Sequence, residues 1–328
     1  MKKPRVVVIG GGSGSYVVLS GLKKYPIHIT SIVTMMDAGG STGRLRDQLG
    51  VLPPGDLRQA LVALSESEDI WRNLFTYRFD TGDLNGHNLG NIFISALEKM
   101  TGSADLALKH ASKLLKTKGT VIPVTSTKCT LCAKYADGSL LEGEPIIDES
   151  FTTRPKILYM YTSPEAQANT KALKAIQEAD YLIFGPGDLY TSIFPNFLVT
   201  GIVDALKSSK AKKIYLLNLM TKLGQTDGYT ASDFLNEMER YSGCTMDYIF
   251  INNKFPSQDM LDWYKKSSNV DLIKDDITTK NFPKTRSIRT DLLSETRYEQ
   301  SIADRIKRSL IRHDSEKTAA ALIDLILM

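Results

Sequence analysis

The first 36 residues of the chain contain a strand, a glycine loop, a helix and a second strand in close succession. Residues 5–9, RVVVI, are a continuous apolar run typical of a buried strand. The loop GGGSG follows at 10–14 and leads into a helical pattern in which Val17, Val18 and Leu22 share one face. The β-branched run IHITSIVTMM at 27–36 completes the unit. A βαβ unit of this kind requires parallel strands joined by a right-handed crossover.

The same alternation of helices and strands continues to the end of the chain. Further helices are predicted at 57–65, 70–75, 91–100 and 104–115, and further strands at 179–184, 212–221 and 247–253. A last amphipathic helix begins near Asp314 or Ser315, either of which suits an N-cap. We therefore predict a Rossmann-like three-layer α/β/α fold with a mostly parallel sheet, built as a single domain of residues 1–328.

Residues 119–160 differ in character from the rest. Their β-branched residues and the turn at Asp137-Gly138 predict an inserted β-rich subdomain with an antiparallel hairpin. A strand is predicted at 156–161 and a helix at 164–178. Residues 265–293 carry little pattern and are predicted to form irregular surface.

Composition limits the classes of function. The 328 residues are 42% hydrophobic and 24% charged, as in soluble globular proteins. A net charge of +4 suits a small anionic ligand but is too small and dispersed for nucleic-acid binding. The apolar run near the start is too short for a signal peptide or a membrane span. Three cysteines, Cys129, Cys132 and Cys244, suit a reducing compartment, and we predict a cytoplasmic protein.

The loop at 10–14 is a candidate phosphate site. N–H groups of a glycine turn that opens a helix attract anions, because the unpaired donors and the helix dipole both favour negative charge. The spacing departs from the dinucleotide motif, since Ser15 stands where the third glycine is required. Gly11, Gly12, Ser13 and Gly14 are the predicted phosphate ligands, and the alternative is a tight turn needed only for packing.

A second glycine-rich loop is predicted after the second strand. Gly39, Gly40 and Ser41 follow Asp37, whose carboxylate could accept a hydrogen bond from a ribose hydroxyl. Arg44 stands just behind them and offers a guanidinium for phosphate. Taken singly, these residues fit a solvated loop before an ordinary helix cap. Together they favour an anion-binding loop.

Polar residues recur in NGHNLGN, residues 85–91. His87 is a candidate acid or base, although a histidine that only bonds a loop carbonyl is the more common case. Asn88 and Asn91 are neutral donors and acceptors suited to orienting an anion or a sugar hydroxyl.

Two further strand ends carry polar residues. The sequence GPGD provides Gly185, Gly187 and Asp188, and NLMT provides Asn218 and Thr221. Because the carboxyl ends of parallel strands meet at one edge, we expect all of these loops to converge on one crevice at the switch point of the sheet.

Two remaining features have competing interpretations. Cys129 and Cys132 have the spacing of a metal or redox pair, but residues three apart on a strand point to opposite faces. No second Cys/His pair in the sequence completes a tetrahedral site. Arg312, in the RHD sequence before the last helix, either reaches the crevice or belongs to an ordinary helix entry.

Several of these motifs together resemble the bacterial gluconeogenesis factor family, a branch of the superfamily that contains 2-phospho-L-lactate transferase. The matching segments are GGGSG, DAGGSTGRLRDQLGVLPPGDLRQALVAL, NGHNLGN, FGPGDLYTSIFPN, NLMT and the terminal RHD. The resemblance runs from about Arg5 to the C-terminus. It implies a Rossmann-like fold, a cytoplasmic location and binding of UDP-N-acetylglucosamine. It also implies a role in cell shape and envelope synthesis during gluconeogenic growth, with no established reaction.

Two positions depart from the family pattern. Ala38 stands where relatives commonly carry a second aspartate, and Gln225 where they commonly carry glutamate. Both changes remove a carboxylate, and magnesium-assisted transfer favours anionic oxygen ligands. We therefore expect a nucleotide-sugar sensor that requires no cofactor, with an envelope-synthesis protein as partner and a homo-oligomer as a further option. The alternative is a transferase acting on a nucleoside-diphosphate-activated donor, with Asp37 as ligand of a divalent metal and His87 as base.

Overall fold

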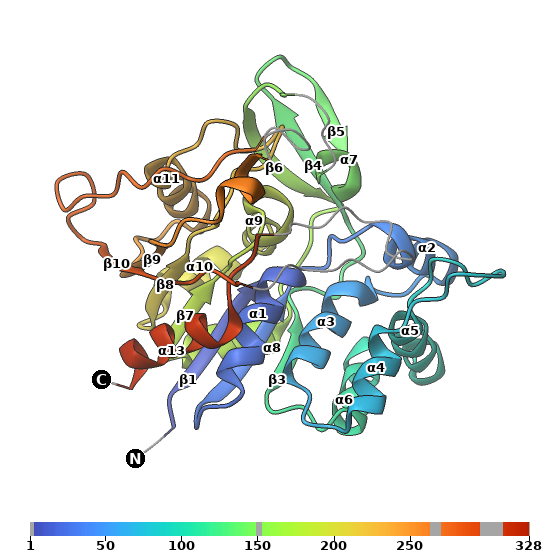
Figure 1. Ribbon diagram of the computed structural model, residues 1–328. Helices are drawn as coiled ribbons and strands as arrows, with labels where there is room; N and C mark the ends of the chain where they lie inside the picture. Colours follow the sequence, from blue (N-terminus) through green and yellow to red (C-terminus); the bar gives the residue numbers. More distant parts are fainter. Residues whose placement is uncertain (1–2, 149–152, 263–269, 296–310, 328) are drawn as a thin grey trace.

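The computed structural model describes residues 3–148, 153–262, 270–295 and 311–327 (Figure 1). Within these ranges one sheet has the strand order β10-β9-β8-β7-β1-β2-β3, and all of its neighbouring pairs are parallel. Its strands are β1 (Arg5–Gly10), β2 (His28–Val33), β3 (Thr120–Pro123), β7 (Tyr181–Phe184), β8 (Lys212–Leu216), β9 (Tyr248–Asn252) and β10 (Arg286–Thr290). The predicted α/β fold with a mostly parallel sheet is confirmed.

Helices cover both faces of this sheet. On one face α1 (Ser13–Leu22) packs between α3 (Pro54–Leu64) and α13 (Ser315–Ile326), in front of the strands in Figure 1. The chain then crosses back over β1, so α8 (Thr170–Glu178) and α10 (Ile202–Ser208) lie on the other face, as right-handed crossovers require. Other helices of the main body include α2 (Gly40–Leu49), α4 (Asp69–Thr76), α5 (Leu89–Thr101), α6 (Ala104–Leu114), η1 (Leu189–Ile193), α9 (Phe194–Phe197) and α11 (Ala231–Ser242).

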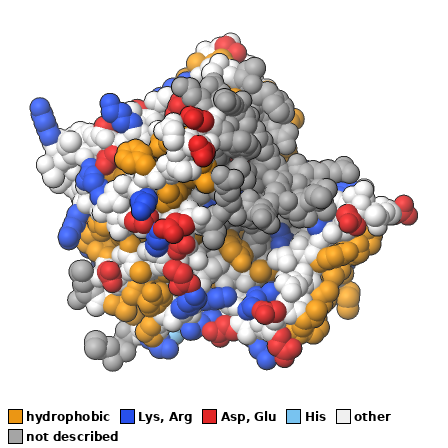
Figure 2. All heavy atoms as spheres, in the orientation of Figure 1, with side chains coloured by type: hydrophobic (Ala, Val, Ile, Leu, Met, Phe, Trp, Pro, Cys, Tyr) orange, Lys and Arg blue, Asp and Glu red, His pale blue; other side chains and the backbone are white. Residues whose placement is uncertain are grey.

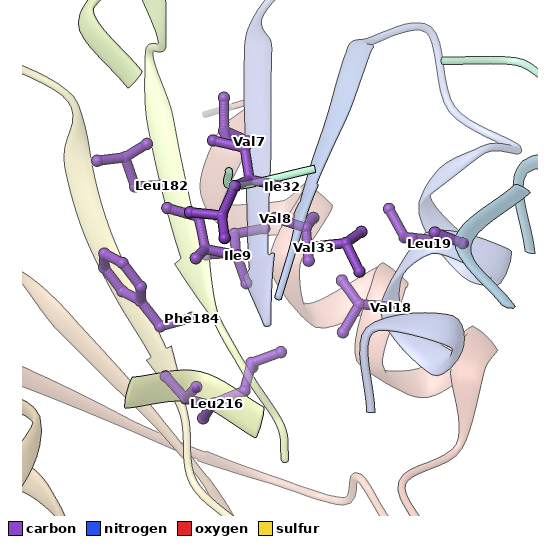
Figure 3. Close-up of a cluster of buried hydrophobic side chains, with 14 of the residues drawn as sticks. Val7, Val8, Ile9, Val18, Leu19, Ile32, Val33, Leu182, Phe184 and Leu216 are labelled. Atoms are coloured by element: carbon purple, nitrogen blue, oxygen red, sulfur yellow. The ribbon is translucent and has the colours of Figure 1, made fainter. Parts of the chain in front are cut away.

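Part of the core packs on β1, which lies inside the sheet between β7 and β2. Successive residues of β1 contribute to both layers, because side chains alternate across a strand. Val8 lies near Val33 and near Val18 of α1, whereas Ile9 lies on the side of Leu182 and Phe184 of β7 (Figure 3). A strand buried on both faces needs a continuous apolar run, and VVVI supplies it.

A second, small sheet lies above the first in Figure 1. It has the antiparallel order β5-β4-β6, from β4 (Thr130–Tyr135), β5 (Leu140–Glu142) and β6 (Ile157–Ser163). The turn at Asp137-Gly138 joins β4 to β5 as predicted, since the Gly138 N–H donates to the carbonyl of Tyr135 and φ at Gly138 is +87°. A short helix, α7 (Glu144–Asp148), follows β5.

Three predictions about local structure are wrong in part. Gly40 opens α2, so the second glycine-rich loop is shorter than predicted. The helix predicted from 164 begins only at Thr170, because residues before it pair with Thr200 and Val124 and Asn169 forms the N-cap. Part of 265–293 is regular, since Arg286–Thr290 forms the edge strand β10; residues 265–269 lie outside the described ranges. No helix in the described ranges has the length and hydropathy needed to cross a bilayer.

Candidate functional site

The strand order puts a topological switch point at the carboxyl ends of β1 and β7, and we call the region outside these strand ends the crevice. From β1 the chain proceeds outward through β2 to β3, and then returns to form β7 on the opposite side of β1. In open parallel sheets, ligands bind outside the carboxyl ends of the strands at such a switch point. The loops after β1, β2, β7 and β8 therefore share one edge, as the sequence predicts.

Two helices begin at this edge with a glycine at the N-cap. Gly12 precedes α1 and Gly39 precedes α2. Glycine has no side chain with which to cap the first N–H groups of a helix. The helices follow neighbouring parallel strands, so both N-termini, with their partial positive charge, lie at the same edge.

The first glycine loop is packed against the other loops of the site. A Cβ atom at Gly14 would overlap the carbonyl oxygen of Pro186, and one at Gly12 would overlap the side chains of Asp56 and Gln59. The loop therefore lies directly between the loop after β7 and the start of α3. Glycine is favoured at these two positions by the packing of the loops against each other, whether or not a ligand also binds there.

Asp37 lies at the end of β2 between two helix N-termini. Its Oδ1 accepts the Gly39 N–H at 2.9 Å. Its Oδ2 would lie 2.6 Å from a Cβ atom at Gly55, in the first turn of α3. The carboxylate therefore faces the positive ends of α2 and α3.

The small sheet contributes a second carboxyl group, Glu144 of α7. Its Oε2 accepts the N–H of Ala38 at 3.5 Å, a long hydrogen bond. Burial, reinforced by the carboxylates of Asp37 and Asp148, raises the pKa of Glu144 to about 9. The group is therefore protonated at neutral pH and adds no negative charge beside Asp37.

Asp148, at the end of α7, joins the loops after β7 and β8. Its Oδ1 accepts hydrogen bonds from Thr191 Oγ1 at 2.8 Å and from Gln225 Nε2 at 3.3 Å. Its Oδ2 lies 3.1 Å from Lys222 Nζ. Lys222 also contacts Asp188 Oδ2 at 3.2 Å. Burial raises the pKa of Asp188, and Lys222 opposes that shift. Lys222 is the cation at this side of the crevice.

The NGHNLGN segment packs against the first turn of α2. Ser41 Oγ lies 3.2 Å from His87 Nδ1 and accepts the N–H of Asn88 at 3.2 Å. Burial and the neighbouring guanidiniums of Arg44 and Arg78 lower the pKa of His87, so the ring is neutral at pH 7.

Asn88 and Asn91 are scaffold residues as well as predicted ligands. Asn88 is the N-cap of α5, accepting the Asn91 N–H at 3.1 Å and donating Nδ2 to Thr76 O at 2.9 Å. Asn91 Oδ1 accepts Nε of the buried Arg58 at 2.8 Å. Both side chains therefore hold the wall of the crevice, and ligand contacts by them stay a prediction.

The loop after β8 is held from two directions. Asn218 Oδ1 accepts the N–H of Gly187 at 3.3 Å, which joins it to the loop after β7. The N–H of Thr221 donates to the carbonyl oxygen of Asp271 at 2.9 Å, and its hydroxyl oxygen accepts the N–H of Asp271. Asn218 thus lies at the crevice, whereas the Thr221 side chain ties the loop to residues 270–273.

The RHD sequence lies beneath the same loop. His313 Nε2 lies 3.1 Å from the carbonyl oxygen of Leu217, so Nε2 carries a proton. Burial lowers the pKa of His313 to about 4. Asp314 caps α13, accepting the N–H groups of Glu316 and Lys317, so of the two predicted caps the structure has Asp314. Arg312 is half-buried beside His313, and its anion-binding role stays a prediction.

Arg44 and Cys129 each contact a residue outside the two glycine loops, Asn85 and Met36 respectively. Arg44 is exposed, and its guanidinium donates to Asn85 O at 3.0 Å. Cys129 and Cys132 are buried free thiols, and burial raises the pKa of Cys129 to about 11. A thiol with this pKa is inert at neutral pH.

Sequence reasoning missed three of the groups that meet at the crevice: Glu144, Asp148 and Lys222. Glu144 and Asp148 lie in a five-residue helix within a segment that reads as β-rich, so no local pattern pointed to them. Lys222 directly follows the NLMT motif, and that position was the available signal. Within the described ranges no three His, Cys, Asp or Glu side chains are arranged to hold a metal ion.

The chain is similar in sequence to known proteins over most of its length. The family described as 2-phospho-L-lactate transferase CofD matches residues 6–293. The chain is 37% identical over 330 residues to a gluconeogenesis factor of Bacillus subtilis, covering 99% of each chain. It is 41% identical over 279 residues to a gluconeogenesis factor of Halalkalibacterium halodurans, covering 84% of this chain and 86% of that one.

A solved structure has the same fold. The crystal structure of a UPF0052 family member from Bacillus halodurans matches this chain with a TM-score of 0.89 and 37% sequence identity. The match covers 98% of this chain and 99% of that one, so the similarity includes the small sheet as well as the large one.

Proposed function

Since the chain belongs to the gluconeogenesis factor family, we propose that it binds a nucleotide sugar, UDP-N-acetylglucosamine, in the crevice between β1 and β7. The observation that carries this proposal is the pair of helices, α1 and α2, that begin with a glycine N-cap after neighbouring strands. A diphosphate needs several N–H donors within a short span, and two helix N-termini supply them.

The other groups of the crevice have complementary roles in this proposal. The diphosphate contacts the N–H groups of residues 11–14 and 39–41, and at Gly39 it replaces Asp37 Oδ1 as the acceptor of the N–H. Gly185, Gly187 and Asp188 form the adjoining wall. Arg44 and Arg312 add positive charge, and Asn218 faces the nucleoside, with Thr221 holding the same loop in place. The remaining pocket for the sugar is lined by Asp37, His87, Asn88 and Asn91.

Two features of the small sheet and its neighbours lower the negative charge of the crevice. A protonated Glu144 removes one negative charge from the side of the crevice that Asp37 occupies. Lys222 supplies a cation that Asp148 and Asp188 hold in place. Without these two features the carboxylates would repel a diphosphate.

In this proposal the protein is a cytoplasmic sensor and not a catalyst. Occupancy of the crevice shifts a conformational population, which an envelope-synthesis protein reads during gluconeogenic growth. The ligand is small, and nucleic acid has no part in the function. A role in cell shape follows from the sugar, which is a building block of the envelope.

Calorimetric titration with UDP-N-acetylglucosamine tests the proposal, and two variants of one residue give the matched control. Gly12→Ala adds only a Cβ, which the flexible side chains of Asp56 and Gln59 can accommodate. Gly12→Asp adds a carboxylate beside the predicted diphosphate. We expect binding by the wild type, weaker binding by the alanine variant and none by the aspartate variant. Equal affinities in the two variants, or no heat with the wild type at millimolar ligand, would contradict the proposal.

A metal-dependent transferase is the second candidate function. It is favoured by the family match, whose description is a transferase. A divalent ion at Asp37 would need substrate oxygens to complete its coordination. Turnover of a nucleoside-diphosphate-activated donor with magnesium, lost in His87→Ala, would support this candidate. A donor that stays intact through long incubation would count against it.

A further inference from the structure

The surface of α4 and α5 carries a band of exposed apolar side chains, which we call the α4–α5 face. It comprises the exposed Ile70, Trp71, Tyr77 and Phe93 and the half-buried Leu74 and Phe79, of which Tyr77 and Phe79 lie just after α4. Ile70 is 57% exposed, Tyr77 50% and Trp71 39%. Figure 2 shows this band at the lower right of the molecule, over the helices labelled α4 and α5 in Figure 1.

The core of the protein uses only part of this band. In α4, DIWRNLFT, Phe75 is the buried residue, and its ring lies 5.2 Å from that of Phe93. Ile70, Trp71 and Leu74 add a second apolar stripe at helical spacing that faces outward. Exposed clusters rich in Trp, Tyr and Phe are typical of protein–protein interfaces and are unusual elsewhere on a monomer.

The rim of the α4–α5 face carries more acidic than basic side chains, and its basic ones include Arg72, Arg78 and Lys118. Five exposed carboxylates flank it, two of them paired: Glu66 with Lys118, and Asp69 with Arg72. The other three, Glu68, Asp80 and Asp83, have no cation partner in the described part of the chain. In Figure 2, acidic side chains stand beyond both ends of the band. This local excess contrasts with the net charge of +4 of the whole chain.

The charge of the rim favours one of two kinds of binding partner for this face. A second copy of the chain, docked about a two-fold axis, would set this acidic rim against an identical one. Like charges across an interface are repulsive and select against the wrong partner. A segment of another protein with apolar residues between basic ones would instead match both the band and its rim. We propose that the α4–α5 face is a docking surface for such a basic-flanked apolar segment. This inference does not depend on the proposed ligand.

Two synthetic helical peptides of equal length test the surface. Both carry the same leucine face, and one has lysine flanks whereas the other has glutamate flanks. We expect the lysine peptide to bind the intact protein at least about tenfold more tightly, a difference of about 1.4 kcal/mol. Ile70→Ser with Trp71→Ser should remove most of this binding. Phe255→Ser, a control at a residue that is 78% exposed elsewhere, should leave it unchanged.

Charge reversal of the unpaired rim separates the acidic contribution from the apolar one. The triple variant Glu68→Lys, Asp80→Lys and Asp83→Lys should prefer the glutamate peptide. Melting temperatures would show that each variant remains folded. Equal binding of the two peptides, or binding that the Ile70/Trp71 variant does not change, would overturn the proposal. It would also be overturned if the wild type were a dimer that the same variant converts to a monomer.

Discussion

The ammonium of Lys222 lies 3.1 Å from the carboxylate of Asp148 and thereby joins the loop after β8 to the short helix of the small sheet. Asp188, from the loop after β7, accepts a hydrogen bond from the same ammonium, with Oδ2 3.2 Å from Lys222 Nζ. Three segments far apart in the sequence therefore meet at one half-buried charge. The position of the small sheet over the crevice depends on this cluster.

Replacing Lys222 by methionine should destabilise the protein by about 1–3 kcal/mol, since two partly buried carboxylates lose their cation. Lys212→Met is the matched control. Lys212 pairs with Asp247 at 2.9 Å on an exposed surface, where an ion pair contributes about 0–1 kcal/mol. Urea unfolding of both variants checks the prediction. A second substitution, Asp188→Asn, should recover part of the loss in Lys222→Met, and equal stability of the two lysine variants would rule out the clustering argument.

Glu144→Gln should stabilise the protein at alkaline pH. The raised pKa of about 9 means that the folded protein keeps a proton that the unfolded chain releases near the ordinary value of 4.5. The stability linked to this group is therefore full below pH 4.5 and falls as the pH rises toward 9. The amide keeps the shape without ionising, so we expect a gain of about 1–3 kcal/mol at about pH 8 and little change at about pH 4.

Unfolding free energies across this pH range measure the Glu144 effect. Glu142→Gln, at an exposed carboxylate of the same segment, should leave the pH profile as it is in the wild type. A stability difference for Glu144→Gln that is constant from acid to alkaline pH would mean that Glu144 ionises in the folded state much as it does in the unfolded chain.

His313 should make the protein sensitive to acid. Its folded pKa of about 4 lies below the ordinary value of 6.5, so the unfolded chain takes up a proton first as the pH falls. The linked stability is full above pH 6.5 and is lost progressively down to about pH 4, by up to about 3 kcal/mol. His313→Asn should flatten the acid limb of the profile of melting temperature against pH. His110→Asn, at an exposed histidine, should not, and an unchanged acid limb in His313→Asn would contradict the account.

Gly14→Ala should be more harmful than Gly12→Ala. The added Cβ at Gly14 meets the backbone of Pro186, which cannot rotate away, whereas at Gly12 it meets the side chains of Asp56 and Gln59. Overpacking against backbone costs about 1–3 kcal/mol. Thermal unfolding of the two variants checks this order, and the reverse order would mean that the two loops are not in contact.

The parallel sheet could be predicted because its strands are buried on both faces. The apolar run of β1 and the β-branched run of β2 leave little choice of secondary structure, and the glycine loop between them fixes the βαβ unit. The resemblance to the gluconeogenesis factor family, stated from the loop motifs, is confirmed by the family match. β10, with the sequence RSIRT and exposed arginines, lies at the sheet edge and lacks such a signal.

The sequence predicts where the loops of the site lie, but it does not predict that the small sheet packs against them. Parallel strands bring their carboxyl ends together, so the convergence of residues 11–14, 37–41 and 185–188 follows from the fold class alone. The positions of Glu144 and Asp148 depend instead on how the small sheet docks, through long-range contacts such as that of Arg240 with the carbonyl of Leu158. Contacts of this kind leave no local pattern in the sequence.

A crystal structure with UDP-N-acetylglucosamine soaked or co-crystallised tests the central claim most directly. We predict diphosphate density against the backbone N–H groups of residues 11–14 and 39–41, with the uracil toward Asn218. Density for the nucleotide at any other place on the molecule, or an empty crevice at saturating ligand, would contradict the account.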